Sequence, residues 1–79
     1  MRIHVDLFNH IWNKVVNSVH KCSMTAQYQF QSVIAYYEGN DRYIVTDNLI
    51  VYCTHEGKLQ LHFEKGNVSD LSNVFNQFI

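Results

Sequence analysis

The N-terminal part of the chain spaces its apolar residues with the period of an α-helix. One face of a helix over residues 7–21 would carry Leu7, Phe8, Ile11, Trp12, Val15, Val16 and Val19. This stripe predicts an amphipathic helix that ends near Cys22 and packs one face against a core. Ile3 continues the stripe one turn earlier. Asp6 is the expected N-cap, because its carboxylate can accept hydrogen bonds from the first free backbone N–H groups.

After residue 27 the apolar residues alternate with polar ones, which is typical of β-strands. Segments rich in β-branched and aromatic residues predict four strands, at 28–37, 42–46, 49–54 and 58–64. Turn-forming residues separate these segments at 38–41, 47–48 and 56–57. Such tight turns join antiparallel neighbours, so the sequence predicts a four-stranded antiparallel meander.

The last residues return to helical spacing. Leu71, Val74, Phe75 and Phe78 follow an i, i+3, i+4, i+7 pattern, and Asn67 or Ser69 is the expected N-cap. The predicted fold class is therefore α+β, with an N-terminal and a C-terminal helix beside the meander. The predicted order is α-β-β-β-β-α, in one domain that covers residues 1–79.

The tight turns also predict which residues share a face of the sheet, because side chains alternate along a strand. We expect Tyr36 opposite Tyr43, Val45 opposite Ile50 and Tyr52 opposite Leu61. One face then collects most of the large apolar side chains and is expected to be the core. It consists of Tyr28, Phe30, Ile34, Tyr36, Tyr43, Val45, Ile50, Tyr52, Leu59, Leu61 and Phe63.

The opposite face is polar at its ends and apolar in the middle. An apolar patch rimmed by polar groups is a common feature of protein interaction surfaces, so this face is the expected binding site for a partner. The alternative is that scattered apolar residues are tolerated there, or that the C-terminal helix crosses to this side and covers them. The predicted partner-binding residues are Val33, Ala35, Tyr37, Arg42, Ile44, Val51 and His62.

Composition narrows the class of protein. The chain has 79 residues, of which 47% are hydrophobic and 16% charged, so we expect a folded chain that does not span a membrane. Its start lacks the features of a secretory signal, which favours the cytoplasm. Residues with AT-rich codons (Phe, Tyr, Met, Ile, Asn, Lys) total 30 and those with GC-rich codons (Gly, Ala, Arg, Pro) total 7, a bias that suits a bacteriophage or another mobile element.

Residues capable of chemistry are few. Cys53, His55 and His62 share the predicted outer face, but their spacing matches no standard zinc site, so we expect neither a metal nor a cofactor. Cys53 beside a histidine has the residue types of a nucleophile and its base, but a flat sheet face offers no pocket, so we expect no enzyme.

Six basic residues against seven acidic ones give a formal net charge of -1, which makes nucleic acid an unfavoured partner. The sequence therefore predicts a small non-enzymatic protein-binding module. More specifically, we expect a phage-type inhibitor of a host protein, of the anti-defence or anti-CRISPR kind, that acts by steric occlusion. A nucleic-acid-binding protein and a homodimeric accessory protein are the alternatives.

Overall fold

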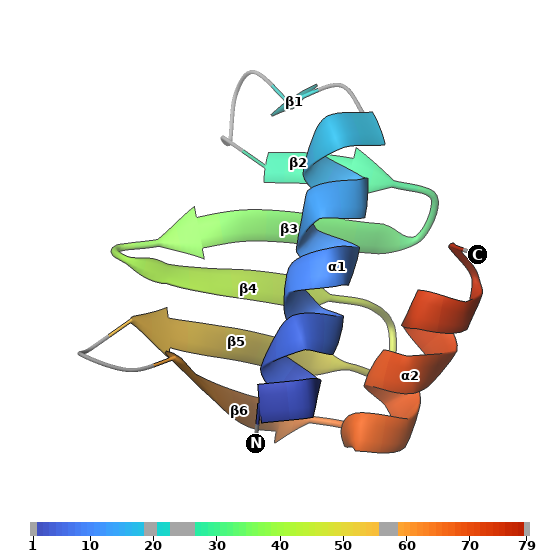
Figure 1. The fold of residues 1–79 in the computed structure, drawn as a ribbon. Coiled ribbons are helices and arrows are strands. Elements are labelled where there is room, and N and C mark those ends of the chain that lie inside the picture. Colours follow the sequence, from blue (N-terminus) through green and yellow to red (C-terminus); the bar gives the residue numbers. More distant parts are fainter. Residues whose placement is uncertain (1, 19–20, 23–26, 56–58, 79) are drawn as a thin grey trace.

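The computed structural model consists of two helices packed on one face of an antiparallel sheet (Figure 1). The structure describes residues 2–18, 21–22, 27–55 and 59–78. The strands are adjacent in the order β1-β2-β3-β4-β5-β6, so each pairs with its neighbour in the sequence. This confirms the α+β class and the antiparallel meander between two helices. The elements are α1 (Arg2–Ser18), β1 (Lys21–Cys22), β2 (Gln27–Phe30), β3 (Val33–Glu38), β4 (Asp41–Val45), β5 (Ile50–His55), β6 (Leu59–Lys65) and α2 (Val68–Asn76).

The sheet has more strands than the four predicted. The predicted strand over 28–37 is a hairpin, in which Phe30 pairs with Val33 across a turn. Gln31 adopts a φ of 56°, a left-handed conformation, and the Gln29 side chain donates a hydrogen bond to its carbonyl oxygen. The turn was missed because it contains none of the usual turn residues Gly, Asn, Asp or Pro in its centre. The two-residue strand β1 adds a sixth strand to the edge.

The limits of α1 differ from the prediction. The helix begins at Arg2, so Asp6 lies inside it and the predicted N-cap is wrong. It ends at Ser18, whereas the prediction continued the helix to residue 21, and Lys21–Cys22 is a short strand instead. The earlier start lets Val5 join the buried side of the helix.

The N-terminus of α2 follows the prediction. Asn67 is the N-cap, and its side-chain oxygen accepts hydrogen bonds from the backbone N–H groups of Ser69 and Asp70. The Asp70 carboxylate in turn accepts a 2.8 Å hydrogen bond from the Asn67 backbone, which completes a capping box. Neither helix is both long enough and apolar enough to cross a membrane, as far as the described residues show.

Gly66 holds the start of α2 close to the loop between β4 and β5. Its φ of 84° is a left-handed conformation, and a Cβ atom there would lie 2.6 Å from the Asn48 carbonyl oxygen. A side chain would therefore push α2 away from the sheet. This close approach brings Leu71 and Val74 of α2 into the core beside Leu49.

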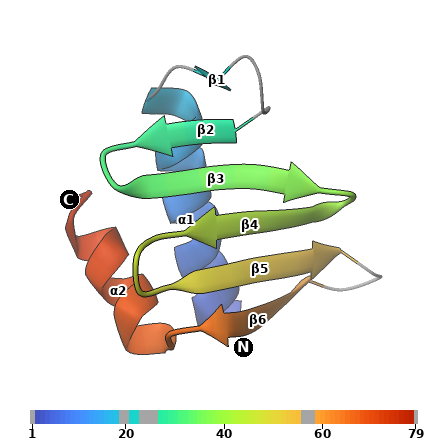
Figure 2. The same ribbon diagram turned by 180° about the vertical axis from the view of Figure 1, so that it is seen from behind.

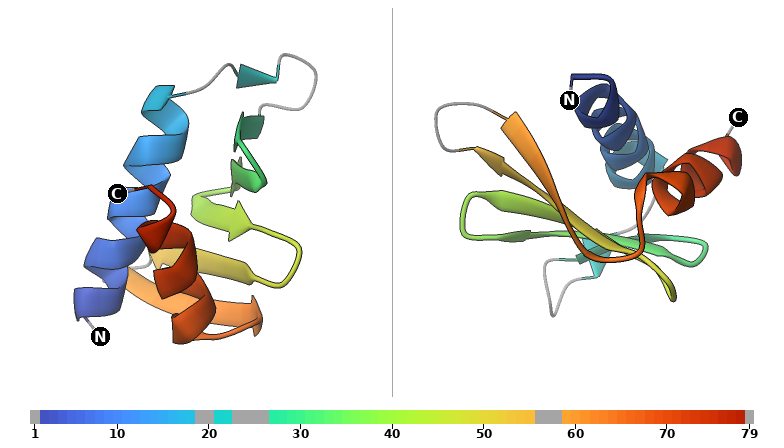
Figure 3. Two further views of the ribbon diagram at one scale, coloured as in Figure 1. Left: turned by 90° about the vertical axis from the view of Figure 1, so that its right-hand side faces the viewer. Right: turned by 90° about the horizontal axis from the view of Figure 1, so that it is seen from below.

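The helices cover the face of the sheet that was expected to be exposed. Figures 2 and 3 show both helices on the same side of the strands. The buried residues of the strands are Val33, Ala35, Ile44, Val51 and Cys53, and Leu49 of the β4–β5 loop joins them. They pack against Phe8, Ile11, Trp12 and Val15 of α1 and against Leu71 and Val74 of α2. The face assignment made from the sequence is therefore wrong for β3, β4 and β5, and the alternative, that the C-terminal helix covers this face, is confirmed. Tyr28 and Phe30 of β2 and Leu61 and Phe63 of β6 pack against the core, as predicted.

We call the side of the sheet that neither helix covers the open face. It carries Ile34, Tyr36, Tyr43, Val45, Ile50, Tyr52 and His62, all half-buried. The first six were expected in the core. Side-chain size explains the inversion, because the small and β-branched residues of the other face let α1 approach closely with its bulky Phe8 and Trp12.

The strand register is correct as far as β5 and changes at β6. Tyr36 pairs with Tyr43 and Val45 with Ile50, as predicted. Tyr52 pairs with His62 and not with Leu61, because the hairpin pairs His55 with Leu59 and not with Lys58, as the predicted two-residue turn would. This one-residue difference places His62 on the open face and turns Leu61 and Phe63 toward the helices, where they pack against the core. A further irregularity in the pairing lies between Ile50 and Val51. The predicted turn at 56–57 lies outside the described residues.

Two adjacent residues of β4 test which face is the core. Ile44 is fully buried beneath the helices, whereas Val45 is half-buried on the open face. Ile44→Asp would bury a carboxylate without a partner, which costs several kcal/mol, so this variant should not fold. Val45→Asp should fold and lose about 1 to 2 kcal/mol of unfolding free energy. Circular dichroism and urea denaturation measure both effects. If Ile44→Asp folds and Val45→Asp does not, the core lies on the face of Val45 and the assignment above is wrong.

Candidate functional site

The seven predicted partner-binding residues lie in three environments. Val33, Ala35, Ile44 and Val51 are fully buried beneath the helices, so they do not form an exposed patch. Tyr37 and Arg42 lie on the same side of the sheet, beside α1. His62 alone belongs to the open face. The structure therefore separates His62 from the other six.

Arg42 and Tyr37 attach α1 to the sheet. The Arg42 guanidinium donates a 2.6 Å hydrogen bond to the side-chain oxygen of Asn9. Its central carbon lies 5.2 Å from the ring centroid of Phe8 and 5.4 Å from that of Trp12, which is the distance of a cation–π contact. The Tyr37 ring meets Trp12 edge to face, with centroids 5.1 Å apart. These contacts give both residues a structural role.

A row of stacked rings crosses the open face. Tyr36, Tyr43, Tyr52 and His62 come one each from β3, β4, β5 and β6 and pair across the strands. Successive ring centroids are 5.0, 4.8 and 5.0 Å apart, and the planes differ by 11 to 19°. We call this row the aromatic ladder. Each ring is half-buried by its neighbours, so the ladder is ordered by contacts within the sheet itself.

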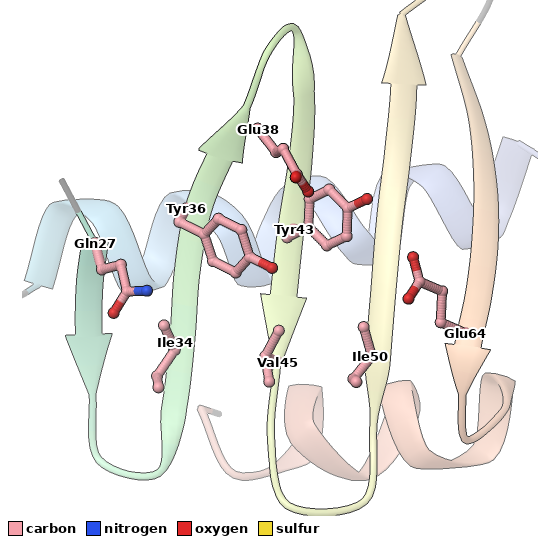
Figure 4. Close-up of a pocket in the computed structure, with 8 residues that line it drawn as sticks. All are labelled: Gln27, Ile34, Tyr36, Glu38, Tyr43, Val45, Ile50 and Glu64. Carbon is pink, nitrogen blue, oxygen red and sulfur yellow. The ribbon is translucent and has the colours of Figure 1, made fainter. Parts of the chain in front are cut away.

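An apolar row runs beside the ladder and forms the base of a shallow hollow. Ile34, Val45 and Ile50 occupy neighbouring positions on β3, β4 and β5. The hollow has a volume of about 380 Å³ and opens toward the side that the helices do not cover (Figure 4). Its lining combines the apolar row, two rings of the ladder and three polar side chains at the rim. The lining residues are Gln27, Ile34, Tyr36, Glu38, Tyr43, Val45, Ile50 and Glu64.

Two carboxylates give the hollow a negative potential. Partial burial, together with the charges of Glu38 and Glu64, raises the pKa of Tyr43 to about 12. Burial and the same two carboxylates also raise the pKa of Tyr36. Both phenols are therefore neutral at physiological pH and can act as hydrogen-bond donors.

Among the described residues, no basic side chain lines the hollow, although Lys65 pairs with Ile50 at its edge. Arg42 is on the helix side of the sheet, and Lys14 is exposed on α1. Lys65, at the end of β6, donates a 2.6 Å hydrogen bond to the backbone carbonyl of Asp47 in the loop between β4 and β5. None of these three basic side chains therefore forms an ion pair with Glu38 or Glu64.

A second hollow of about 420 Å³ lies between α2 and the β4–β5 loop. Several of its polar side chains bond to one another: the Thr46 hydroxyl donates to the side-chain oxygen of Asn48, and the Asn48 amide donates to Asp70. Asp70 also belongs to the capping box of α2. These groups attach the loop to the helix, so the open face is the stronger candidate for binding.

Of the two histidines considered with Cys53 for catalysis or metal binding, His55 lies on the same side of β5 but is exposed at the end of the strand, and His62 lies on the opposite face. Cys53 is a free thiol buried among the core residues, whereas His62 stacks on Tyr52 on the open face. Alternation along β5 separates them, because Tyr52 and Cys53 are consecutive. Within the described residues, no group of three or more His, Cys, Asp or Glu side chains could hold a metal ion.

The three tyrosines of the aromatic ladder were visible in the sequence as one row, but their meaning was missed, and the predicted register put Leu61 in the place of His62. Three tyrosines and a histidine occupy one cross-strand row, and each ring carries a polar group that needs water or a hydrogen-bond partner. The opposite row, Ala35, Ile44 and Val51, has only alkyl side chains. This difference in polarity indicates which face is solvated.

Comparison with known proteins gives no further guide to function: no family model matches the chain, and searches of curated proteins and of solved structures also found no match.

The raised pKa of Tyr43 can be tested by alkaline titration. We expect tyrosinate absorbance to show a late transition near pH 12 in the wild-type chain, which Tyr43→Phe removes. Glu38→Gln should shift this transition to lower pH, because it removes one negative charge beside the phenol. Tyr37→Phe, on the other side of the sheet, is the control and should leave the late transition in place.

The same shift fixes the pH range over which Tyr43 contributes to stability. Its folded-state pKa lies above the ordinary value of 10.0, so its contribution is complete below pH 10 and is lost as the pH rises toward 12. An unfolding free energy that rises over this range, or a Glu38→Gln variant whose late transition does not move, would contradict the proposed environment of Tyr43.

Proposed function

We propose that this chain is a non-enzymatic protein-binding module that contacts its partner through the open face of the sheet. One observation carries the proposal. The aromatic ladder and the apolar row form a continuous surface on the side that neither helix covers. Tyrosine is enriched in protein interfaces, because a rigid ring offers a large contact area and a polar hydroxyl.

The ordering of this surface supports binding. Because the rings stack on one another, their side chains lose little further conformational freedom when a partner arrives. The molecule measures 32 × 27 × 20 Å along its principal axes, so one broad face can supply the roughly 800 Å² per partner of a standard interface. Such a surface can block a partner's own site by covering it.

The charges of the open face favour protein over nucleic acid. Phosphate contacts dominate nucleic-acid affinity, and the hollow carries Glu38 and Glu64 where such a site would carry lysine or arginine. A homodimer through this face receives less support, since face-to-face packing would bring four carboxylates into one interface. Catalysis by Cys53 is also disfavoured, because its thiol is buried in the core and His62 lies on the opposite face.

The narrower form of the proposal is that the chain is a phage-type inhibitor of a host protein and acts by occlusion. It rests on composition, and the open face supplies a surface of the required kind. The partner-binding residues of this proposal are those of the open face, in place of the buried patch expected from the sequence.

The proposal can be tested by capture with two variants that each add one negative charge. Val45→Asp places the charge on the open face, and Asn13→Asp places it on the exposed side of α1. Each variant and the wild-type chain would be immobilised separately on a resin. Each resin would then be incubated with lysate from cells that encode the protein. We expect a partner that wild type and Asn13→Asp retain equally, and that Val45→Asp retains at least tenfold less.

Binding must then be repeated with the purified partner, because only the selective loss in Val45→Asp supports the open face. A partner retained equally by all three chains would contradict the proposal. So would capture that Asn13→Asp abolishes and Val45→Asp leaves intact, or a wild-type chain that captures nothing.

A further inference from the structure

The lining of the hollow indicates the chemistry of the partner. We infer that the open face binds an arginine-bearing segment of a partner protein, with guanidinium groups beside Glu38 and Glu64 and alkyl stems over the apolar row. This inference rests on the proposed function and adds the identity of the group that is recognised.

The hollow has the two parts that a long cationic side chain needs. Its base consists of the alkyl side chains of Ile34, Val45 and Ile50, and its rim carries exposed carboxylates (Figure 4). Arginine has an apolar stem and a charged head, and it buries the stem along apolar surface while the head stays at the rim. A purely apolar segment would leave both carboxylates at the edge of a dry interface, which is unfavourable.

The two carboxylates come from different strands, so they can accept more than one cationic group. Glu38 ends β3 and Glu64 lies on β6, with β4 and β5 between them. Neighbouring strands are about 4.8 Å apart, so three intervals separate the two backbones by about 14 Å. This span exceeds the reach of one guanidinium and suits a segment with two arginines.

Glu38 lies beside Tyr43 of the ladder (Figure 4). Its carboxylate can accept several hydrogen bonds, so lone pairs are available for a guanidinium. Arginine can use two parallel N–H groups on one carboxylate, whereas lysine offers a single point charge.

The end of the ladder favours arginine over lysine. Tyr43 and Tyr52 each have rings stacked on both sides, whereas Tyr36 has one ring neighbour in the ladder, and the other side of its ring is turned toward β2 and Gln27. A planar guanidinium can stack on this free side of Tyr36, and the Gln27 amide oxygen can accept a hydrogen bond from it.

The inference can be tested with hexa-arginine as the probe and with matched double variants. Glu38→Gln/Glu64→Gln removes the two carboxylates of the hollow. Asp6→Asn/Asp47→Asn removes two exposed carboxylates elsewhere and changes the net charge by the same amount. Calorimetry measures the Kd, and NMR shift changes locate the peptide.

We expect hexa-arginine to shift the resonances of Tyr36 and Tyr43 and to bind wild type and the control alike, within about twofold. The affinity for hexa-arginine should fall at least tenfold in Glu38→Gln/Glu64→Gln. Hexa-lysine should bind the wild-type chain more weakly than hexa-arginine does. Equal Kd values for the two double variants, shifts confined to the helices, or no binding would overturn the inference. The inference would also be overturned if the wild-type chain sediments as a dimer and Glu38→Gln/Glu64→Gln sediments as a monomer. The open face would then bind a second copy of the chain.

The result separates this inference from the proposed function. If the partner from the capture experiment needs Val45 but binds Glu38→Gln/Glu64→Gln as tightly as wild type, the open face is the binding surface and its partner is not cationic. If Val45→Asp leaves capture unchanged, the proposed function itself fails.

Discussion

The close packing of α1 on the small-residue face of the sheet determines the rest of the structure. Ala35, Ile44 and Val51 form a smooth surface, and α1 lays Phe8 and Trp12 against it. Arg42 and its contacts with Asn9 and the two rings fasten the helix at one side. Because α2 joins the same core, both helices lie on one side of the strands. The tyrosine-rich face is therefore left open.

The open face is stabilised by its own contacts. Stacking across four strands half-buries the rings of the ladder. The side chains of the apolar row lie beside the rings and are also half-buried. The surface is thus ordered before any partner arrives, which lowers the entropic cost of binding. The carboxylates at its rim restrict the partners it can accept, because a partner must supply positive charge or leave those groups in water.

The sequence was sufficient to predict most elements but not their arrangement in layers. Periodicity predicted both helices, and turn residues gave the pairing of Tyr36 with Tyr43 and of Val45 with Ile50. Alternation could not show which face is covered, since both faces carry enough apolar residues to form a core. The hairpin turn at Gln31 has no Gly, Asn, Asp or Pro at its centre, and the β5–β6 hairpin pairs His55 with Leu59 and not with Lys58, as a two-residue turn would. The candidate site was misplaced because alternation alone could not show which face the helices cover.

The central claim is that the tyrosine-rich face is exposed to solvent while the face with Ile44 is covered. NMR relaxation in the presence of a soluble, uncharged paramagnetic agent tests it in the wild-type chain without any substitution. The account predicts strong relaxation enhancement for the ring protons of Tyr36, Tyr43 and Tyr52, and weak enhancement for the methyl groups of Val33, Ala35, Ile44 and Val51. Enhancement of those methyl groups, with the tyrosine rings protected, would contradict it.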